Sequence, residues 1–443
     1  MWMVEAASLR ILFDPLLGPT HHDGLFTVTP PRHIAVDALR PDVIVVSHRH
    51  PDHFDLGSLH QLASRYPDAV VLTADALVGR TCQRLGFAHV SLLPDHQRLD
   101  LGDLQLLTTA SHCAVDEWGV LLSTADGTAW NQIDTVLGPP ATVRETLARA
   151  SQTLGVPSLV DGPDLGIVRW QPLLQVGAAL GKAPAFPHAG WRRELERILA
   201  TNPGHAVLGA AGGAYVGHSA WQNQREWPVS TGRAQRDLRA VGFGASVDAL
   251  TTGTTWTLRG GEVTTDTSGG AELVEVTGPP ISRAFAPDTL PAVTDPDPRG
   301  LRALTPLVDA WVRGPLADAV AQALPAAGIL EATLQLDAVA CDGAVGWALT
   351  LSAGEVRVRE GSHADPDMVN TIALGDLHDV LEGSAHWGRP LLGGRLRAMD
   401  RLVLVRDGTL TRPRLPPFFL YLALPYDTAT ERWVEHDLAV RGC

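Results

Sequence analysis

The side chains best suited to chemistry are crowded into one short stretch, VIVVSHRHPDHFD, at residues 43–55. Its first half is a run of β-branched apolar residues, which is typical of a buried strand. Imidazole and carboxylate groups are the usual protein ligands of zinc, iron and manganese. The second half of the stretch carries three histidines and two aspartates: His48, His50, Asp52, His53 and Asp55. The stretch therefore indicates a metal site on a loop at the end of a strand.

The spacing within this loop suits two neighbouring metal ions. His48 and His50 are two residues apart, so on an irregular loop both imidazoles can converge on one cation. Asp52 and His53 follow at once and can reach a second cation beside the first. Asp55 has a different expected role, because the helical sequence after it needs a side chain to cap its first backbone N–H groups.

The loop has the spacing HxHxDH, behind a strand and before a helix, and in this it resembles the metallo-β-lactamase-fold superfamily. The resemblance covers roughly residues 8–260 and implies an α/β fold, the αββα sandwich. It also implies a site for two divalent metal ions. Zinc is the favoured metal, with iron and manganese as alternatives, because these ligand types suit all three.

The same resemblance implies ligands from later strands. His112 would complete the first site with the first two histidines of the loop, and Asp134 would hold the second metal with the Asp-His pair of the loop. Family members close the second site with a further histidine, for which His218 is the expected residue and His205 the alternative. Asp14 would hold the histidine loop by hydrogen bonds. Each of these residues also has a structural alternative, as a loop histidine or a turn cap.

Metal ions on this loop would support hydrolysis. A bound divalent ion lowers the pKa of water from about 15.7 to near 7 and polarises a neighbouring carbonyl or phosphoryl oxygen. Asp52 would orient the nucleophile or accept its proton, which makes it the expected catalytic residue. The favoured function is a metallohydrolase that uses a metal-bound hydroxide on an ester, amide, thioester or phosphodiester of a small substrate, for which an apolar molecule is one option.

Oxygen chemistry on the same fold is the alternative function. The runs ILFDPLL, SHRHPDHFD, WNQID and AGGAY also resemble the CMP-sialic acid hydroxylase-like branch of the superfamily. Related biosynthetic hydroxylases of this fold use paired irons, so this resemblance implies a non-haem di-iron oxygenase. The CMP-sialic acid hydroxylase-like proteins need a Rieske cluster, which is held by Cys-x-His pairs. The sequence contains no Cys-x-His pair.

Short apolar runs that alternate with turns and helical stretches must position these ligands. Asp126-Gly127 stands between two such runs and is a strong hairpin signal, because both turn positions tolerate positive φ. Helices are expected at 142–155 and 191–201, inside a segment at 136–204 that we expect to be a lid or a substrate-binding insertion. Strands are expected at 9–13, 43–47, 69–72, 104–108, 119–124 and 206–217.

The composition along the chain predicts two domains. Residues 1–278 would form the metal-binding catalytic domain, and residues 279–300, rich in Pro and Asp, a linker. Residues 301–443 would form an α+β domain, whose part at 301–410 resembles the sterol-carrier-protein-2-like fold. This resemblance implies an apolar tunnel, or a module for substrate presentation and homodimerisation. A plain accessory domain is the alternative.

Tryptophan is frequent in and around residues 136–204. Buried core is the usual place for this side chain, but an aromatic wall over the metal site would suit an apolar or ring-bearing substrate. The residues concerned are Trp130, Trp170, Trp191, Trp221 and Trp227.

Charge and composition limit the partners. The formal net charge is −14 and no basic run occurs, which argues against nucleic acid and favours a small-molecule substrate. No apolar run reaches the length of a membrane span. The four cysteines are scattered and the N-terminus lacks the pattern of a signal peptide, so we expect a cytoplasmic protein.

Overall fold

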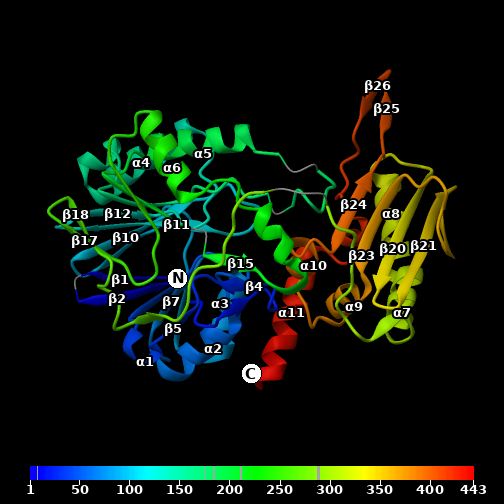
Figure 1. Cartoon of the computed structure of the whole chain (residues 1–443), viewed down its shortest axis with the longest axis horizontal. Helices are drawn as coiled ribbons and strands as arrows, with labels where there is room; N and C mark the ends of the chain where they lie inside the picture. The colour runs from blue at the N-terminus through cyan, green and yellow to red at the C-terminus, as the bar shows by residue number, and fades with distance from the viewer. Residues whose placement is uncertain (7, 175, 183–184, 210–211, 287–289) are drawn as a thin grey trace.

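Two β-sheets lie face to face in the N-terminal part of the protein, as the computed structural model in Figure 1 shows. The structure describes residues 1–6, 8–174, 176–182, 185–209, 212–286 and 290–443. The first sheet has five strands, with β1 antiparallel to β2 and the others parallel to their neighbours. In spatial order its strands are β1 (Trp2–Ala6), β2 (Leu9–Phe13), β6 (Val43–Val46), β7 (Val70–Thr73) and β8 (His89–Leu92).

The apolar run before the histidine loop forms β6, and all four of its residues are buried. Val43 and Val45 pack into the core between the two sheets, whereas Ile44 and Val46 pack under the outer helices. A parallel strand that is covered on both faces is apolar at every position rather than at alternate ones. The loop with the metal-type ligands therefore starts from one of the best-packed strands of the sheet.

The second sheet has seven strands and contains the predicted hairpin. Asp126 and Gly127 lie at the turn between β11 and β12, where Thr124 pairs with Gly127 in antiparallel register. Gly127 has a φ of 140°, which favours glycine at this position. In spatial order the strands are β16 (Ser246–Ala249), β14 (His205–Leu208), β13 (Leu165–Val168), β12 (Gly127–Asn131), β11 (Trp118–Thr124), β10 (Leu104–Ala110) and β9 (Arg98–Leu101).

Helices cover the outer face of each sheet, so the layers are αββα, which is the sandwich of the metallo-β-lactamase fold. Apolar residues of the two inner faces, such as Phe13 and Trp118, meet in the core between the sheets. In the described part of the chain, no helix combines the length and the apolarity needed to cross a membrane. The covering helices are α2 (Leu56–Arg65) and α3 (Ala76–Leu85) on the first sheet, and α4 (Pro140–Leu154), α5 (His188–Thr201) and α6 (Thr231–Ala240) on the second.

Within residues 136–204, strand β13 and helices α4 and α5 are part of the sandwich, whereas we expected this segment to be a lid or a substrate-binding insertion. Strand β13 lies between β12 and β14 and is parallel to both. Helix α4 precedes β13 in the chain and α5 follows it, and both helices pack on the sheet. All four residues of β13 are buried. A buried strand this short carries no alternation of apolar and polar residues, so the sequence pattern did not reveal it.

The single strand expected at 206–217 is two strands in different sheets. Strand β14 belongs to the seven-stranded sheet, whereas β15 (Gly213–Tyr215) pairs with β4 (Phe26–Val28) in a three-stranded sheet that β3 (Thr20–His21) completes. Residues 210–211, between β14 and β15, lie outside the described residues. The remaining elements of this part are α1 (Val36–Leu39), β5 (Arg32–Ile34), β17 (Thr255–Arg259), β18 (Glu262–Asp266), β19 (Val274–Val276), η1 (Pro157–Asp161) and η2 (Gly217–Gln224).

The C-terminal part is an α+β unit with its own five-stranded sheet (Figure 1). Strands β20 and β23 are parallel and the other neighbours are antiparallel. Helices pack on the sheet around the buried Trp347. Its elements are α7 (Gly300–Trp311), η3 (Val312–Leu316), α8 (Ala317–Ala326), β20 (Ala332–Ala340), β21 (Gly343–Ser352), β22 (Glu355–Glu360), β23 (Met368–Ala373), α9 (Leu374–Glu382), α10 (Gly388–Leu392), β24 (Leu396–Asp400), β25 (Leu404–Arg406), β26 (Thr409–Thr411) and η4 (Phe419–Leu422).

The last helix, α11 (Tyr426–Arg441), returns to the sandwich. Its buried Trp433, Val434 and Leu438 pack in the same core as α2 and α3. An ion pair of 2.5 Å between Arg84 of α3 and Glu435 of α11 lies at the edge of this contact. The C-terminal part of the chain is therefore fastened to the helix layer that lies behind the histidine loop.

A buried carboxylate marks the region where β15 and η2 meet. The side chain of Glu226 is 1% exposed, and its Oε2 atom has no hydrogen-bond partner among the described residues. Burial raises the pKa of Glu226 to about 8, although the positive charge of Arg225 acts in the opposite direction. At neutral pH the folded protein therefore holds a proton on this side chain.

Replacing this group should change the pH dependence of stability. Because the pKa of Glu226 is raised in the folded state, the stabilisation from its proton is complete below about pH 4.3 and is lost as the pH rises through 8. Between pH 6 and pH 9 the free energy of unfolding of wild type should fall by about 3 kcal/mol more than that of Glu226→Gln. Urea unfolding at both pH values measures this, with the exposed Glu331→Gln as control. Equal falls for wild type and Glu226→Gln would contradict the account.

Candidate metal centre

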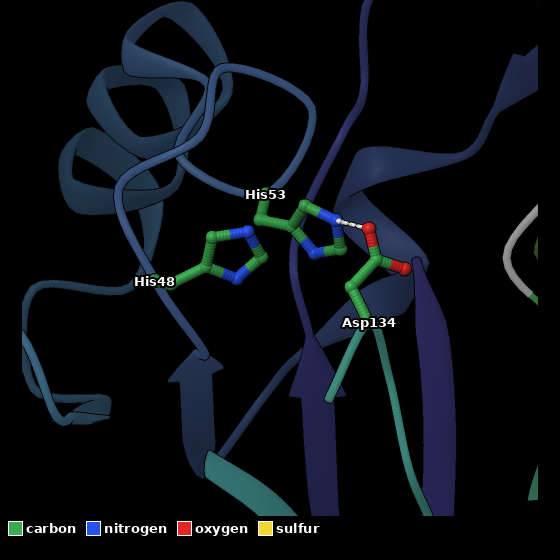
Figure 2. Close-up of side chains that lie close together, drawn as sticks. All are labelled: His48, His53 and Asp134. Atoms are coloured by element: carbon green, nitrogen blue, oxygen red, sulfur yellow. Dashed lines mark ion pairs between the residues drawn. The ribbon is translucent and has the colours of Figure 1, made fainter. Parts of the chain in front are cut away.

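The histidine loop leaves the carboxyl end of β6 and folds at once into a tight turn. The backbone N–H groups of His53 and Phe54 both donate to the carbonyl of His50, at 2.9 and 2.8 Å. The Phe54 ring is fully buried under the loop. This turn places His48 and His53 side by side, with 4.3 Å between their ring centroids. Figure 2 shows His53 between His48 and Asp134, with the imidazole of His53 paired with the Asp134 carboxylate.

Asp14 holds the loop from the neighbouring strand, as predicted. It follows β2, which is parallel to β6, and its backbone adopts a left-handed φ of 45°. Its Oδ1 accepts a hydrogen bond from the Ser47 N–H at 2.8 Å, and its Oδ2 lies 3.0 Å from His53 Nδ1. With Nδ1 engaged in this way, His53 presents Nε2 to the site, which is the arrangement of a metal-binding imidazole.

Asp134 reaches the loop from the opposite sheet. It follows β12, and the preceding residue, Ile133, has a φ of 53°, a conformation that is strained for a β-branched side chain. Arg169, after β13, donates to the backbone carbonyl of Asp134 at 3.0 Å. The Asp134 Oδ2 atom lies 3.3 Å from His53 Nε2. The second sheet thus supports a strained turn that carries one carboxylate to the histidine loop.

Three of the predicted ligands form a compact group, shown in Figure 2. Potential ligand atoms of His48, His53 and Asp134 all lie within 4.8 Å of one another. His50 joins this group through His48, whose Nε2 is 2.7 Å from His50 Nδ1. Asp52 joins it through His53, at 3.4 Å between Oδ2 and Nε2. The structure therefore brings five of the seven predicted metal ligands together.

The electrostatics of this group favour a bound cation. Burial alone would lower the pKa of His53, but the surrounding carboxylates, Asp52 foremost, raise that pKa well above its usual value. Desolvation would raise the pKa of Asp52 and of Asp134, but the charge of His53 lowers both values. The two carboxylates are therefore ionised at neutral pH and lie beside a positive partner, a role that the protonated His53 fills and that a metal ion could fill in its place.

His48 and His50 are suited to a metal for a different reason. Burial lowers the pKa of His48 well below its usual value, and burial also lowers the pKa of His50. Both imidazoles are therefore neutral at pH 7, which is the protonation state that coordinates metals. The Oγ atom of Ser47, 2.9 Å from His48 Nδ1, fixes the orientation of the more deeply buried ring.

His112 and His218 lie apart from this group. The side chain of His112 is exposed and packs against Gly138, and that of His218 is exposed on η2. Among the described residues, the group with ligand atoms in mutual reach contains neither of them. His205, the alternative, lies at the start of β14, with its Nε2 3.1 Å from Asp248 Oδ2. Asp55 has the predicted capping role, since its side chain accepts from the Ser58 N–H.

The sequence interpretation missed two residues beside the site. Glu117 is 5% exposed, and its pKa is raised by burial and by the charge of Asp134. Its position directly before the apolar strand β11 was the available signal. His22 lies in the corner between β3 and β4, with its Nε2 4.0 Å from Asp52 Oδ1. There the signal was a His-His pair in front of an Asp-Gly turn.

The tryptophans do not line the site as a wall. Trp130 packs beneath α4, Trp170 packs beneath α5 and α6, and Trp191 is a buried residue of α5 in the same core. Trp227 packs against Tyr215, with ring centroids 5.4 Å apart. Trp221 packs against the backbone of the C-terminal unit. They are core and contact side chains, which is the usual place for tryptophan.

Comparison with known proteins gives similarities at low sequence identity. No family model matches the chain, and no curated protein matches it. A possible metal-dependent hydrolase from Veillonella parvula is 15% identical, with 56% of this chain and 92% of that chain covered and a TM-score of 0.39. CmlA, a diiron β-hydroxylase from Streptomyces venezuelae, is 16% identical over 56% of this chain, with a TM-score of 0.37. The chain spans 50% of the length of CmlA.

A separate match concerns the C-terminal unit. Sterol Carrier Protein 2 Like 2 from Aedes aegypti is 19% identical, with a TM-score of 0.18. The match covers 22% of this chain and 87% of that chain.

Arg49, inside the histidine loop, fastens the site to its surroundings. Its guanidinium binds both oxygens of Asp75, at 2.5 and 3.1 Å, and Asp75 is fully buried. Asp75 also caps α3, since it accepts from the Leu77 N–H at 2.8 Å. On its other side Arg49 contacts Asp427 of α11 at 3.1 Å. One side chain therefore links the loop, the helix layer and the C-terminal helix.

Removing the Arg49 side chain should destabilise the folded protein. Arg49→Ala leaves the Asp75 carboxylate buried without its partner, and we expect a loss of about 3–5 kcal/mol in the free energy of unfolding. Asp427 is 71% exposed, so Asp427→Asn should cost no more than about 1 kcal/mol. Urea unfolding at pH 7 compares both variants with wild type. Similar costs for the two variants would contradict this assignment.

Proposed function

We propose that the protein is a metal-dependent hydrolase with a dinuclear site on the histidine loop. The observation that carries the proposal is the convergence of His48, His53 and Asp134, whose ligand atoms lie within 4.8 Å of one another. These residues come from two facing sheets and are held by hydrogen bonds from behind, as metal ligands are. Two of the carboxylates beside His53 belong to or follow a residue with left-handed backbone, Asp14 itself and Ile133 before Asp134, and such backbone is concentrated at functional sites.

The donor set fits two ions. His48 and His50 would hold the first ion and Asp52 and His53 the second, and Asp134, with a ligand atom within 4.8 Å of those of His48 and His53, would serve both. When bound, the ions supply a water of lowered pKa and polarise the oxygen of the bond to be cleaved. Zinc is the metal we propose, since neutral imidazoles and carboxylates are its usual oxygen and nitrogen ligands.

Asp52 is the residue we propose for proton transfer. Its pKa is held well below the usual range by the charge of His53, so it is an ionised acceptor at neutral pH. Its carboxylate is partly exposed, which leaves it accessible to a water and a substrate. Asp52 would orient the attacking water and accept its proton while an ester, amide, thioester or phosphodiester bond of a small molecule is cleaved.

A di-iron oxygenase is the second candidate, and Glu117 is the observation that favours it. This buried carboxylate lies close enough to Asp134 for the negative charge of Asp134 to raise its pKa. A site with two imidazoles and additional carboxylates is typical of non-haem iron enzymes that use oxygen. Glu117 would then serve as a further carboxylate ligand beside Asp134 and His53.

Metal content tests the proposal directly. Protein purified without added metal should carry two equivalents of zinc by elemental analysis. His50→Ala should lose at least one equivalent and Asp134→Asn should weaken both sites, because Asp134 would serve both ions. His89→Ala, which changes an exposed histidine of β8, is the matched control.

The metal found decides between the candidates. Two irons with a visible absorption band and oxygen uptake would favour the oxygenase over the hydrolase. Absence of stoichiometric zinc, iron and manganese, together with unchanged stability of His50→Ala, would contradict both.

A further inference from the structure

We propose that His22, in the corner between β3 and β4, is a ligand of the second metal together with Asp52 and His53. This inference rests on the proposed function, since it requires a metal at the histidine loop. It assigns the closing position to a residue from the N-terminal end of the chain, whereas family resemblance placed that position after a late strand.

The distance between His22 and Asp52 suits a shared ion. The Nε2 atom of His22 lies 4.0 Å from Oδ1 of Asp52. Two atoms that are each 2.0–2.2 Å from one ion are separated by at most about 4.4 Å. The other oxygen of Asp52 faces His53 Nε2 at 3.4 Å. Asp52 therefore lies between two imidazoles, with one oxygen directed at each of them.

The His22 side chain is held in this orientation. It is 8% exposed, and its Nδ1 lies 2.8 Å from Nδ1 of His21, so Nε2 is the nitrogen that remains for Asp52. A metal-binding imidazole is oriented in this way, by a hydrogen bond to its other nitrogen. His21 is itself fixed, because it stacks on Phe26 with 5.0 Å between ring centroids.

The backbone of the corner is strained in a way that directs His22 inward. His22 and Asp23 have φ values of 51° and 53°, which are left-handed for two consecutive residues that are not glycine. Leu25 closes the corner by donating its N–H to the His22 carbonyl at 3.1 Å. Strained backbone of this kind persists where the surroundings enforce it, and it is concentrated at functional sites.

The C-terminal unit enforces this conformation. The N–H of His386 donates to Asp23 Oδ2 at 3.2 Å, so the unit holds the carboxylate next to His22. Gly388 approaches the His22 ring so closely that an added Cβ would lie 3.3 Å from His22 Cδ2. The unit therefore contacts both residues of the strained corner, Asp23 through a hydrogen bond and the His22 ring through close packing.

The rival candidate for this position is less well placed. His218 lies on η2 with an exposed side chain. His22, in contrast, is buried, oriented and directed at a carboxylate of the histidine loop. His218→Ala is therefore a matched control for His22→Ala.

Cobalt and zinc binding test the assignment without any assay of activity. Metal-free wild type, His22→Ala and His218→Ala are titrated with Co²⁺, whose visible spectrum reports each coordination sphere, and with Zn²⁺ in competition with a chelator. Wild type should bind two ions. His22→Ala should bind the first ion normally and the second at least tenfold more weakly, with a changed cobalt spectrum. His218→Ala should match wild type.

The outcomes separate this inference from the proposed function. Wild type that binds neither ion would overturn the proposed function and, with it, the inference. Two ions in wild type with unchanged affinity and spectrum in His22→Ala would overturn the assignment of His22 alone. Loss of the second ion in His218→Ala but not in His22→Ala would give the position to His218. If circular dichroism shows that His22→Ala is misfolded, His22→Gln fills the same space and is judged by the same titration.

Discussion

The charge cluster around His53 is the interaction on which the site depends. This imidazole contacts Asp14 at the end of the first sheet, Asp52 in its own loop and Asp134 at the end of the second sheet. Several carboxylates this close together, and partly shielded from water, are stable in the ionised form only when a positive charge lies beside them. The cluster therefore fixes the relative positions of the two sheets at this edge and, at the same time, creates a place for a cation.

The C-terminal unit makes contacts that hold residues of the site in position. Helix α11 packs into the core of the first helix layer, and Asp427 of this helix pairs with Arg49 between the first two histidines of the loop. Gly388 and His386 hold the corner that carries His22. Both parts of the chain are therefore needed to position the proposed ligands, although every residue of the histidine loop comes from the sandwich.

Local features were predictable from the sequence because short-range physics determines them. The apolar run of β6, the Asp55 cap of α2 and the hairpin at Asp126-Gly127 each depend on a few adjacent residues. The four residues of β13 were not recognised, because a short buried strand has no periodicity of its own. As a result, its whole segment was interpreted as a lid instead of a layer of the sandwich.

The sequence did not predict which residues distant from the histidine loop in the chain would lie beside it. Asp14 was predictable, because parallel pairing of β2 and β6 brings its strand end to the loop. Glu117 and His22 reach the site only through the packing of the two sheets and of the C-terminal unit. His112 and His218 were chosen by resemblance in chain order, and both are exposed in this fold.

The central claim is that one loop and Asp134 form a dinuclear metal centre, and anomalous X-ray diffraction at the zinc edge tests it most directly. Crystals grown at neutral pH with zinc should give two strong peaks beside the histidine loop, one at His48 and His50 and one at Asp52 and His53. No peak at the loop, or peaks only at exposed histidines such as His112 and His218, would contradict the account.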